Sequence, residues 1–135
     1  MNVFIVIVLL IQLLLKDQIS AQSASDLAAY RKMQDDCAKE LKVSADEVKQ
    51  LNSDKGSPSE ALKCYQSCLY KKMGLLSADG KRNDEAILKY AQMRFIGTPV
   101  DKLKAQLTQC AATKGDTECD MVWSFEQCMQ KGLKA

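Results

Sequence analysis

The sequence predicts an all-α domain of about six short helices that is cross-linked by disulfide bonds. Nearly every segment carries residues that begin or end helices, and no segment alternates between apolar and polar residues as a strand would. Six cysteines follow a short apolar leader. An even number of cysteines behind such a leader indicates disulfides, because the secretory route is oxidising.

The leader predicts a signal peptide over residues 1–21, cleaved after Ala21 or, as a second choice, after Ser23. Residues 3–15 are apolar except for Gln12. That run is shorter than the roughly 20 residues that span a bilayer, and small residues follow it. No Lys or Arg precedes the run, so an uncleaved anchor is the alternative. Cleavage leaves a secreted, extracellular domain over residues 22–135 that does not insert into a membrane.

The first two predicted helices lie before the polar run 52–57. Ser25 can cap a helix that ends at about Leu41. Ser44 begins a capping box with Glu47, the third residue after it. A short second helix is therefore expected after Ser44.

The third helix is expected to begin at Pro58 after the cap Ser57, because Ser57-Pro58-Ser59-Glu60 repeats the capping box with proline at the first helical position. It runs to about Met73, where Gly74 suits the C-terminal cap.

Three further helices complete the domain. The fourth spans about residues 84–96 and is stopped by Gly97, and the fifth starts in the segment 98–101 and carries Cys110. Asp116 or Thr117 caps the sixth, which is apolar on nearly every side. In a small domain such a helix packs against several neighbours.

The cysteines favour bridges between helices. Cys64 and Cys68 share one helical face and project together onto a neighbour, whereas Cys119 and Cys128 lie too far apart along one helix to pair. Spacing alone leaves all fifteen pairings open. Zinc ligation is disfavoured because the chain has no histidine and no second tight cysteine pair.

The cysteine spacing is similar to that of the six-cysteine insect odorant-binding proteins, which include the pheromone-binding proteins. The gaps between successive cysteines are 26, 3, 41, 8 and 8 residues, and that family has three residues in the second gap and eight in the fifth. The segments 63–70 and 119–123 also resemble the family around its cysteines. The resemblance extends over residues 25–132.

The resemblance implies a hydrophobic cavity between the helices and three interlocked bridges, Cys37–Cys68, Cys64–Cys119 and Cys110–Cys128. It also implies a carrier of small hydrophobic odorants or pheromones, such as volatile alcohols, aldehydes, esters or terpenoids, in the sensillar lymph. An olfactory receptor and a second copy of the chain are candidate partners. No cofactor, no metal and no catalytic residue is expected.

An apolar cavity needs an apolar lining with few polar groups. The candidates are inward positions of helices three to six: Met73, Leu76, Ile87, Tyr90, Ala91, Phe95, Leu103, Leu107, Val122, Trp123 and Phe125. Ordinary core packing is the alternative for each of them. Trp123, the only tryptophan, is the first choice for stacking on a ligand, and Tyr90 is the preferred polar contact. The pairs Lys71-Lys72 and Lys81-Arg82 are interpreted as solvated surface.

Other function classes fit less well. A net charge of +2 from mixed residues disfavours nucleic acid and membrane-active toxins, and an enzyme lacks both histidine and a nucleophile beside a base. A carrier or scavenger in saliva, haemolymph or a reproductive secretion fits the sequence as well as an olfactory one. Without histidine, we expect little change in binding between pH 5 and 7.

Overall fold

The structure is a computed structural model that describes residues 2–52 and 57–133. The chain forms two units that divide between Asp36 and Cys37, and each is described by itself. Within the described residues every element is a helix, and the only strand-like pairing is a single bridge between Leu76 and Arg82. The prediction of an all-α fold with about six helices is confirmed.

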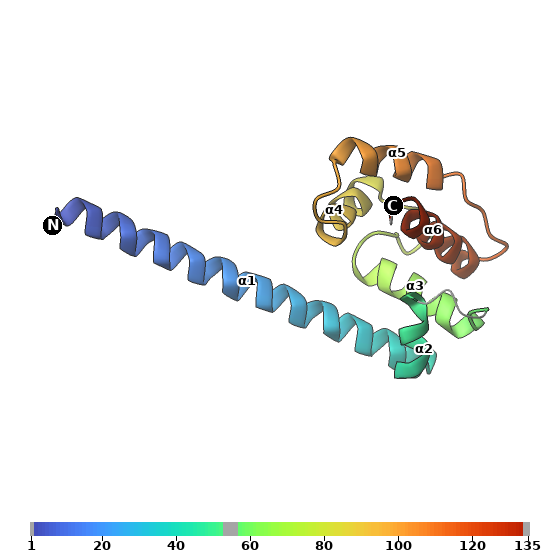
Figure 1. Cartoon of the computed structure of the whole chain (residues 1–135). Coiled ribbons are helices and arrows are strands. Elements are labelled where there is room, and N and C mark those ends of the chain that lie inside the picture. Colours follow the sequence, from blue (N-terminus) through green and yellow to red (C-terminus); the bar gives the residue numbers. More distant parts are fainter. Residues whose placement is uncertain (1, 53–56, 134–135) are drawn as a thin grey trace. The chain divides into compact units, whose positions relative to one another are not determined.

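The first unit is the N-terminal part of α1, which runs from Val3 to Leu41 (Figure 1). The prediction that a helix begins at Ser25 is wrong, because α1 passes through this residue without a break. Residues 3–41 contain neither glycine nor proline, so no residue interrupts the hydrogen-bonded ladder. A search of the described helices finds none that is long and apolar enough to cross a membrane.

The second unit begins with the last turn of α1, which places Cys37 in the core with no exposed surface. α2 (Ala45–Lys49) follows and continues into the 3₁₀ helix η1 (Gln50–Asn52). Ser44 accepts the backbone N–H of Glu47, and the Glu47 carboxylate accepts the backbone N–H of Ser44. The predicted capping box is confirmed.

α3 (Glu60–Lys72) begins two residues later than expected. The cap is Ser59, not Ser57, because the Ser59 hydroxyl accepts the backbone N–H of Leu62 at 3.1 Å. The same hydroxyl donates to the Glu47 carboxylate at 3.1 Å and so ties α3 to α2. The other end is as predicted, with Gly74 at a φ of 72° directly after the helix cap.

α4 (Asp84–Arg94), α5 (Val100–Cys110) and α6 (Glu118–Leu133) complete the unit. α4 ends two residues earlier than expected, and Gly97 follows it at a φ of 87°. Thr117 caps α6, because its hydroxyl accepts the backbone N–H of Asp120 at 3.1 Å.

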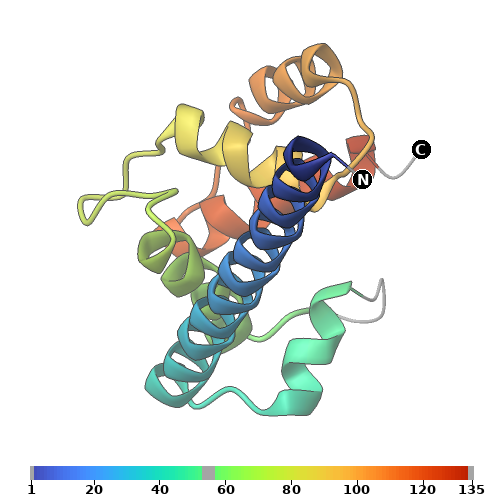
Figure 2. The ribbon, with the colours of Figure 1, turned by 90° about the vertical axis from the view of Figure 1, so that its left-hand side faces the viewer.

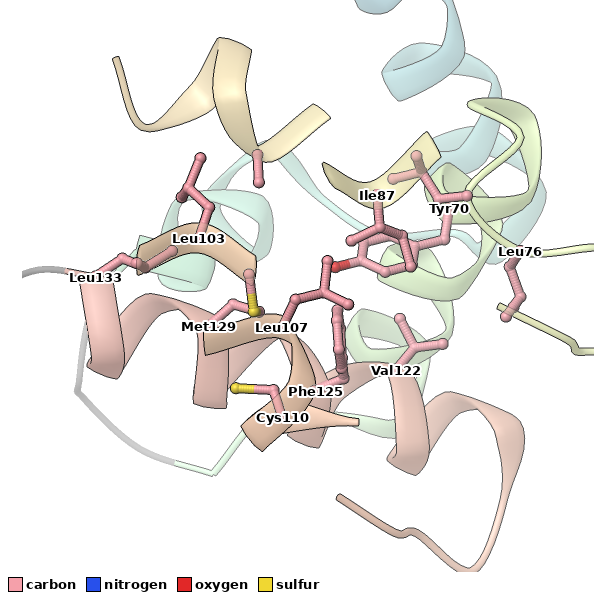
Figure 3. Packing of buried hydrophobic residues seen from close by; sticks show 12 residues of the cluster. Tyr70, Leu76, Ile87, Leu103, Leu107, Cys110, Val122, Phe125, Met129 and Leu133 are labelled. Carbon is pink, nitrogen blue, oxygen red and sulfur yellow. The ribbon is translucent and has the colours of Figure 1, made fainter. Parts of the chain in front are cut away.

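α6 occupies the middle of the second unit. It packs against α3 on one side and α5 on another, and α5 also contacts α4. Two views at right angles show α6 passing between α3 and α5 (Figures 1 and 2). The apolar faces of α3 to α6 therefore meet in one core, which Figure 3 shows from close by.

Three disulfides hold this arrangement: Cys37–Cys68, Cys64–Cys119 and Cys110–Cys128. They are the pairs that the family resemblance implies. Each bridge closes a loop that contains one cysteine of the next bridge, so the three are interlocked, and each joins two different helices. The last turn of α1 is thereby cross-linked through α3 and α6 to α5, whereas α2 and α4 carry no cysteine.

Candidate functional site

Ten of the eleven candidate lining residues meet in one place, which we call the core cluster. Its buried members come from α3, the α3–α4 loop, α4, α5 and α6. The candidates that are buried in the core cluster are Leu76, Ile87, Ala91, Leu103, Leu107, Val122 and Phe125. Those that are partly buried against it are Met73, Tyr90 and Phe95. Whether these side chains touch a ligand stays a prediction.

Trp123 lies apart from the core cluster. The positions that α6 buries are spaced by three and four residues, from Val122 and Phe125 to Leu133. Trp123 does not fall on that spacing. It lines a separate groove of about 760 Å³ between α5 and α6. The groove is largely polar in its residues, with Gln106, Gln109 and Lys131 among them. The structure thus separates the preferred stacking residue from the other candidates.

A buried polar group that the sequence analysis did not predict contacts the core cluster at Tyr70. Glu126 is only 3% exposed on the inner face of α6. One carboxylate oxygen accepts the hydroxyl of Tyr70 at 2.5 Å. The other accepts N–H groups from Arg94 and, at 3.2 Å, from Gln130. Figure 3 shows the Tyr70 hydroxyl oxygen among the apolar side chains of the cluster.

The electrostatics of this group follow from its burial. Burial, together with the charge and hydrogen bond of Glu126, raises the pKa of Tyr70 well above its usual value, so the phenol stays a donor. Burial works against the charged form of Arg94, but the charge and hydrogen bond of Glu126 outweigh it and raise the pKa of the guanidinium. Glu126 and Arg94 thus form an ion pair next to an apolar interior, where pairing offsets the cost of removing both charges from water.

The interpretation of Lys81-Arg82 as solvated surface is wrong for Arg82, whose guanidinium lies beside the core cluster. Its guanidinium carbon lies 5.2 Å from the ring centroid of Phe125, inside the core cluster. Its Nη2 donates to the carbonyl of Ala111 at 3.2 Å, and its Nη1 is buried. Lys81 itself is solvated, with 84% of its side chain exposed.

Lys71 and Lys72 form ion pairs rather than an unpaired basic patch. Lys71 contacts Glu118 at 2.7 Å and Lys72 contacts Glu40 at 3.2 Å. Hydrogen bonds from Lys71 and Ser67 lower the pKa of Glu118. These pairs lie beside two of the disulfides, where they line a pocket of about 360 Å³.

A metal site does not fit the residues that come closest to one. Glu60, Cys64 and Cys119 bring potential ligand atoms together, but the two cysteines are bonded to each other. Metal ligation requires thiolates, which this disulfide does not provide.

Comparison with known proteins agrees with this architecture. The PBP/GOBP family model matches residues 20–132. General odorant-binding protein 56a of Drosophila melanogaster is 32% identical over 106 residues, covering 78% of this chain and 72% of that protein. General odorant-binding protein 19d of the same species is 22% identical, covering 87% and 77%.

Two solved structures share the fold. The fatty acid binding protein OBP56a from the oral disk of the blowfly Phormia regina is 30% identical, with a TM-score of 0.65 over 80% of this chain and 91% of that one. The Drosophila melanogaster odorant-binding protein dmelOBP28a is 23% identical, with a TM-score of 0.66 over 82% and 93%. The chain therefore belongs to the PBP/GOBP family of insect odorant-binding proteins, which are carriers of small hydrophobic ligands and not enzymes.

Proposed function

We propose that this carrier binds its ligand against the core cluster, at the side where Tyr90 and Phe95 are only partly buried. The observation that supports this most is that ten of the candidate lining residues, which come from separate elements, lie together in the core cluster. Two exposed apolar side chains are also close to Phe95 in the sequence, Ile96 and Met93, which are 87% and 71% exposed. A ligand that covers this surface would remove apolar area from water.

For the ligand itself we propose the odorant class: volatile alcohols, aldehydes, esters or terpenoids carried through the sensillar lymph. The buried Tyr70–Glu126–Arg94 group supports ligands that are not pure hydrocarbons, because its donors and acceptors could orient a polar end. An olfactory receptor and a second copy of the chain are the further partners that we propose.

A non-olfactory carrier is the second candidate. Its support is the blowfly relative, which is described as a fatty acid binding protein from the oral disk, a mouthpart rather than an antenna. Transcript levels in antennae and mouthparts distinguish the two settings. Strong antennal enrichment favours olfaction, and enrichment confined to mouthparts favours the alternative.

The proposal also includes removal of residues 1–21 as a signal peptide. The full chain would be expressed in insect cells and the protein purified from the medium. We expect N-terminal sequencing to begin at Gln22, or at Ala24 for the second-choice site. Retention of the chain in membranes with an intact leader would contradict the cleavage.

Ligand binding by the secreted protein is tested by displacement of the fluorescent probe N-phenyl-1-naphthylamine. Ten-carbon alcohol, aldehyde and acetate ligands are expected to displace it at micromolar concentrations. The assignment of the odorant class would be contradicted if the protein bound neither the probe nor any of these three ligands.

A further inference from the structure

The groove between α5 and α6 is a feature of the second unit that the proposed carrier function does not use. Its volume of about 760 Å³ falls within the range of about 300–1,000 Å³ that small-molecule sites occupy. None of the buried members of the core cluster lines it, so it is a separate surface. The residues that line it include Gln106, Gln109, Trp123, Ser124, Gln127 and Lys131.

The two walls of the groove are fixed relative to each other. The Cys110–Cys128 disulfide joins α5 to α6, and the Gln106 side chain on α5 donates to the backbone carbonyl of Cys128 on α6 at 3.0 Å. A Cβ at position 132 would overlap the carboxamide of Gln106, so Gly132 makes room for this contact. The groove is therefore formed before a ligand binds, and the ligand need not bring its walls together.

The lining combines neutral hydrogen-bonding groups with one aromatic ring. Each glutamine carboxamide supplies two N–H donors and an oxygen acceptor, and the Ser124 hydroxyl both donates and accepts. Among the described lining residues Lys131 alone carries a charge, and it is exposed. Trp123 is only partly buried, so part of its apolar surface remains available to a ligand in the groove.

We propose that this groove is a second binding site, for a neutral saccharide whose pyranose ring stacks on Trp123 and whose hydroxyl groups bond to the glutamine carboxamides. A sugar hydroxyl donates and accepts, as a carboxamide does, so two neighbouring hydroxyls match one glutamine side chain. The C–H face of the ring is apolar and slightly positive, which suits the negative face of the indole. A charged ligand gains little more, because an ion pair with an exposed lysine contributes little. The site is independent of the carrier function, whose ligand is assigned to the core cluster.

The groove can be observed directly, because Trp123 is the only tryptophan of the chain and its emission reports this groove alone. The secreted protein is titrated at pH 7 with methyl β-D-glucopyranoside, sorbitol or glucuronate. The glucoside should change the emission saturably with a Kd of about 1–10 mM, which corresponds to a few net hydrogen bonds. Sorbitol has the hydroxyl groups without the ring and should give no saturable change. Glucuronate adds a carboxylate to the ring and should bind within about fivefold of the glucoside.

Gln109→Leu and Gln127→Leu test the two walls of the groove. Each replaces an accessible carboxamide by an apolar side chain of similar size, so the fold should be unaffected. Each should weaken binding of the glucoside by about twofold to tenfold, as for the loss of one neutral hydrogen bond. Gln92→Leu is the matched control, because it makes the same change at an exposed position of α4 outside the groove. It should leave the affinity unchanged.

Several results would overturn the proposed site. An equal response to sorbitol would show a general effect of the added polyol on the protein. Glucoside binding that neither groove variant weakens would show that the carboxamides do not hold the ligand. Binding of glucuronate without binding of the glucoside would indicate an anion site at Lys131 instead.

Two further measurements complete the test. Saturation with dodecanol should leave the Kd of the glucoside unchanged, and competition between the two would contradict a second site. If emission does not respond, ¹H–¹⁵N NMR of the Trp123 indole and the glutamine side chains decides the question. Saturable shifts that include the indole would support the site, and their absence would overturn it while leaving the carrier function untouched.

Discussion

Breaking the Arg94–Glu126 pair should lower the free energy of unfolding, because it leaves a buried carboxylate without its cation. Arg94→Met leaves Glu126, which is 3% exposed, with only the neutral donors Tyr70 and Gln130. Breaking a buried pair in this way costs about 3–5 kcal/mol. Because 27% of the Arg94 side chain is exposed, water screens the pair and the lower figure, about 3 kcal/mol, applies.

The double variant Arg94→Met, Glu126→Leu removes both charges and should recover most of that loss. It remains about 1 kcal/mol less stable than the unaltered protein, because the hydroxyl of Tyr70 loses its acceptor. The two substitutions are therefore non-additive by about 2 kcal/mol or more.

Urea unfolding with the disulfides intact, followed by far-UV circular dichroism, measures the free energies of unfolding. The control is Lys89→Met, which removes an exposed partner of Glu85 and should cost less than about 0.5 kcal/mol. A loss in Arg94→Met as small as that of the control, or simple addition of the two core substitutions, would refute the argument.

Three other measurements test the same core. Since Tyr70 has a raised pKa in the folded protein, its phenol ionises first in the unfolded protein, and the free energy of unfolding should fall as pH rises above about 10. Urea titrations should find a shallower fall in Tyr70→Phe. An equal fall in the variant would contradict the pKa shift. Replacing Cys64 and Cys119 by alanine opens a loop of 55 residues and should cost about 4 kcal/mol in the same assay; a loss below about 1 kcal/mol would count against this bridge. Probe binding should change little between pH 5 and 7, because the shifted pKa values of Glu118 and Tyr70 lie below and above that range and the chain has no histidine. A steep loss of probe binding at pH 5 would show that another group controls it.

The fold could be predicted because its determinants are local. Capping residues such as Ser44 and Thr117 mark helix starts by side-chain hydrogen bonds that span only three residues. Errors occurred where two local signals competed. Ser57 and Ser59 can both cap a helix, and Ser59 is selected by its contact with Glu47, which lies 12 residues away in the sequence.

Ten members of the core cluster could be predicted as inward positions of the helices, whereas the buried Glu126, which contacts the member Tyr70, was not predicted. Glu126 lies four residues after Val122 and three before Met129, both buried, so the spacing did carry a signal for its position. Its charge predicts an exposed position instead, because an unpaired glutamate is rarely buried. Its partner Arg94 lies 32 residues away, and only the folded chain brings the two together.

Trp123, the first choice for stacking on a ligand because of its size and its place between two cysteines, lies outside the core cluster, and its contact with a ligand stays a prediction. The adjacent Val122 lies on the buried face of α6, and one residue further along a helix turns the side chain by about 100°. Position along the helix, rather than apolar area, therefore decides which side of α6 a side chain occupies. The fold places Trp123 against α5 instead, in the groove with Gln106.

Intermolecular nuclear Overhauser effects test the central claim, that the ligand binds at the core cluster, most directly. The protein would be labelled with ¹³C at isoleucine, leucine and valine methyl groups and with ¹⁵N at the tryptophan indole, and studied with bound dodecanol. We predict contacts from the ligand chain to Ile87, Leu103 and Val122, and none to the Trp123 indole. Contacts to Trp123 without any to these methyl groups would place the ligand in the α5–α6 groove and contradict the account.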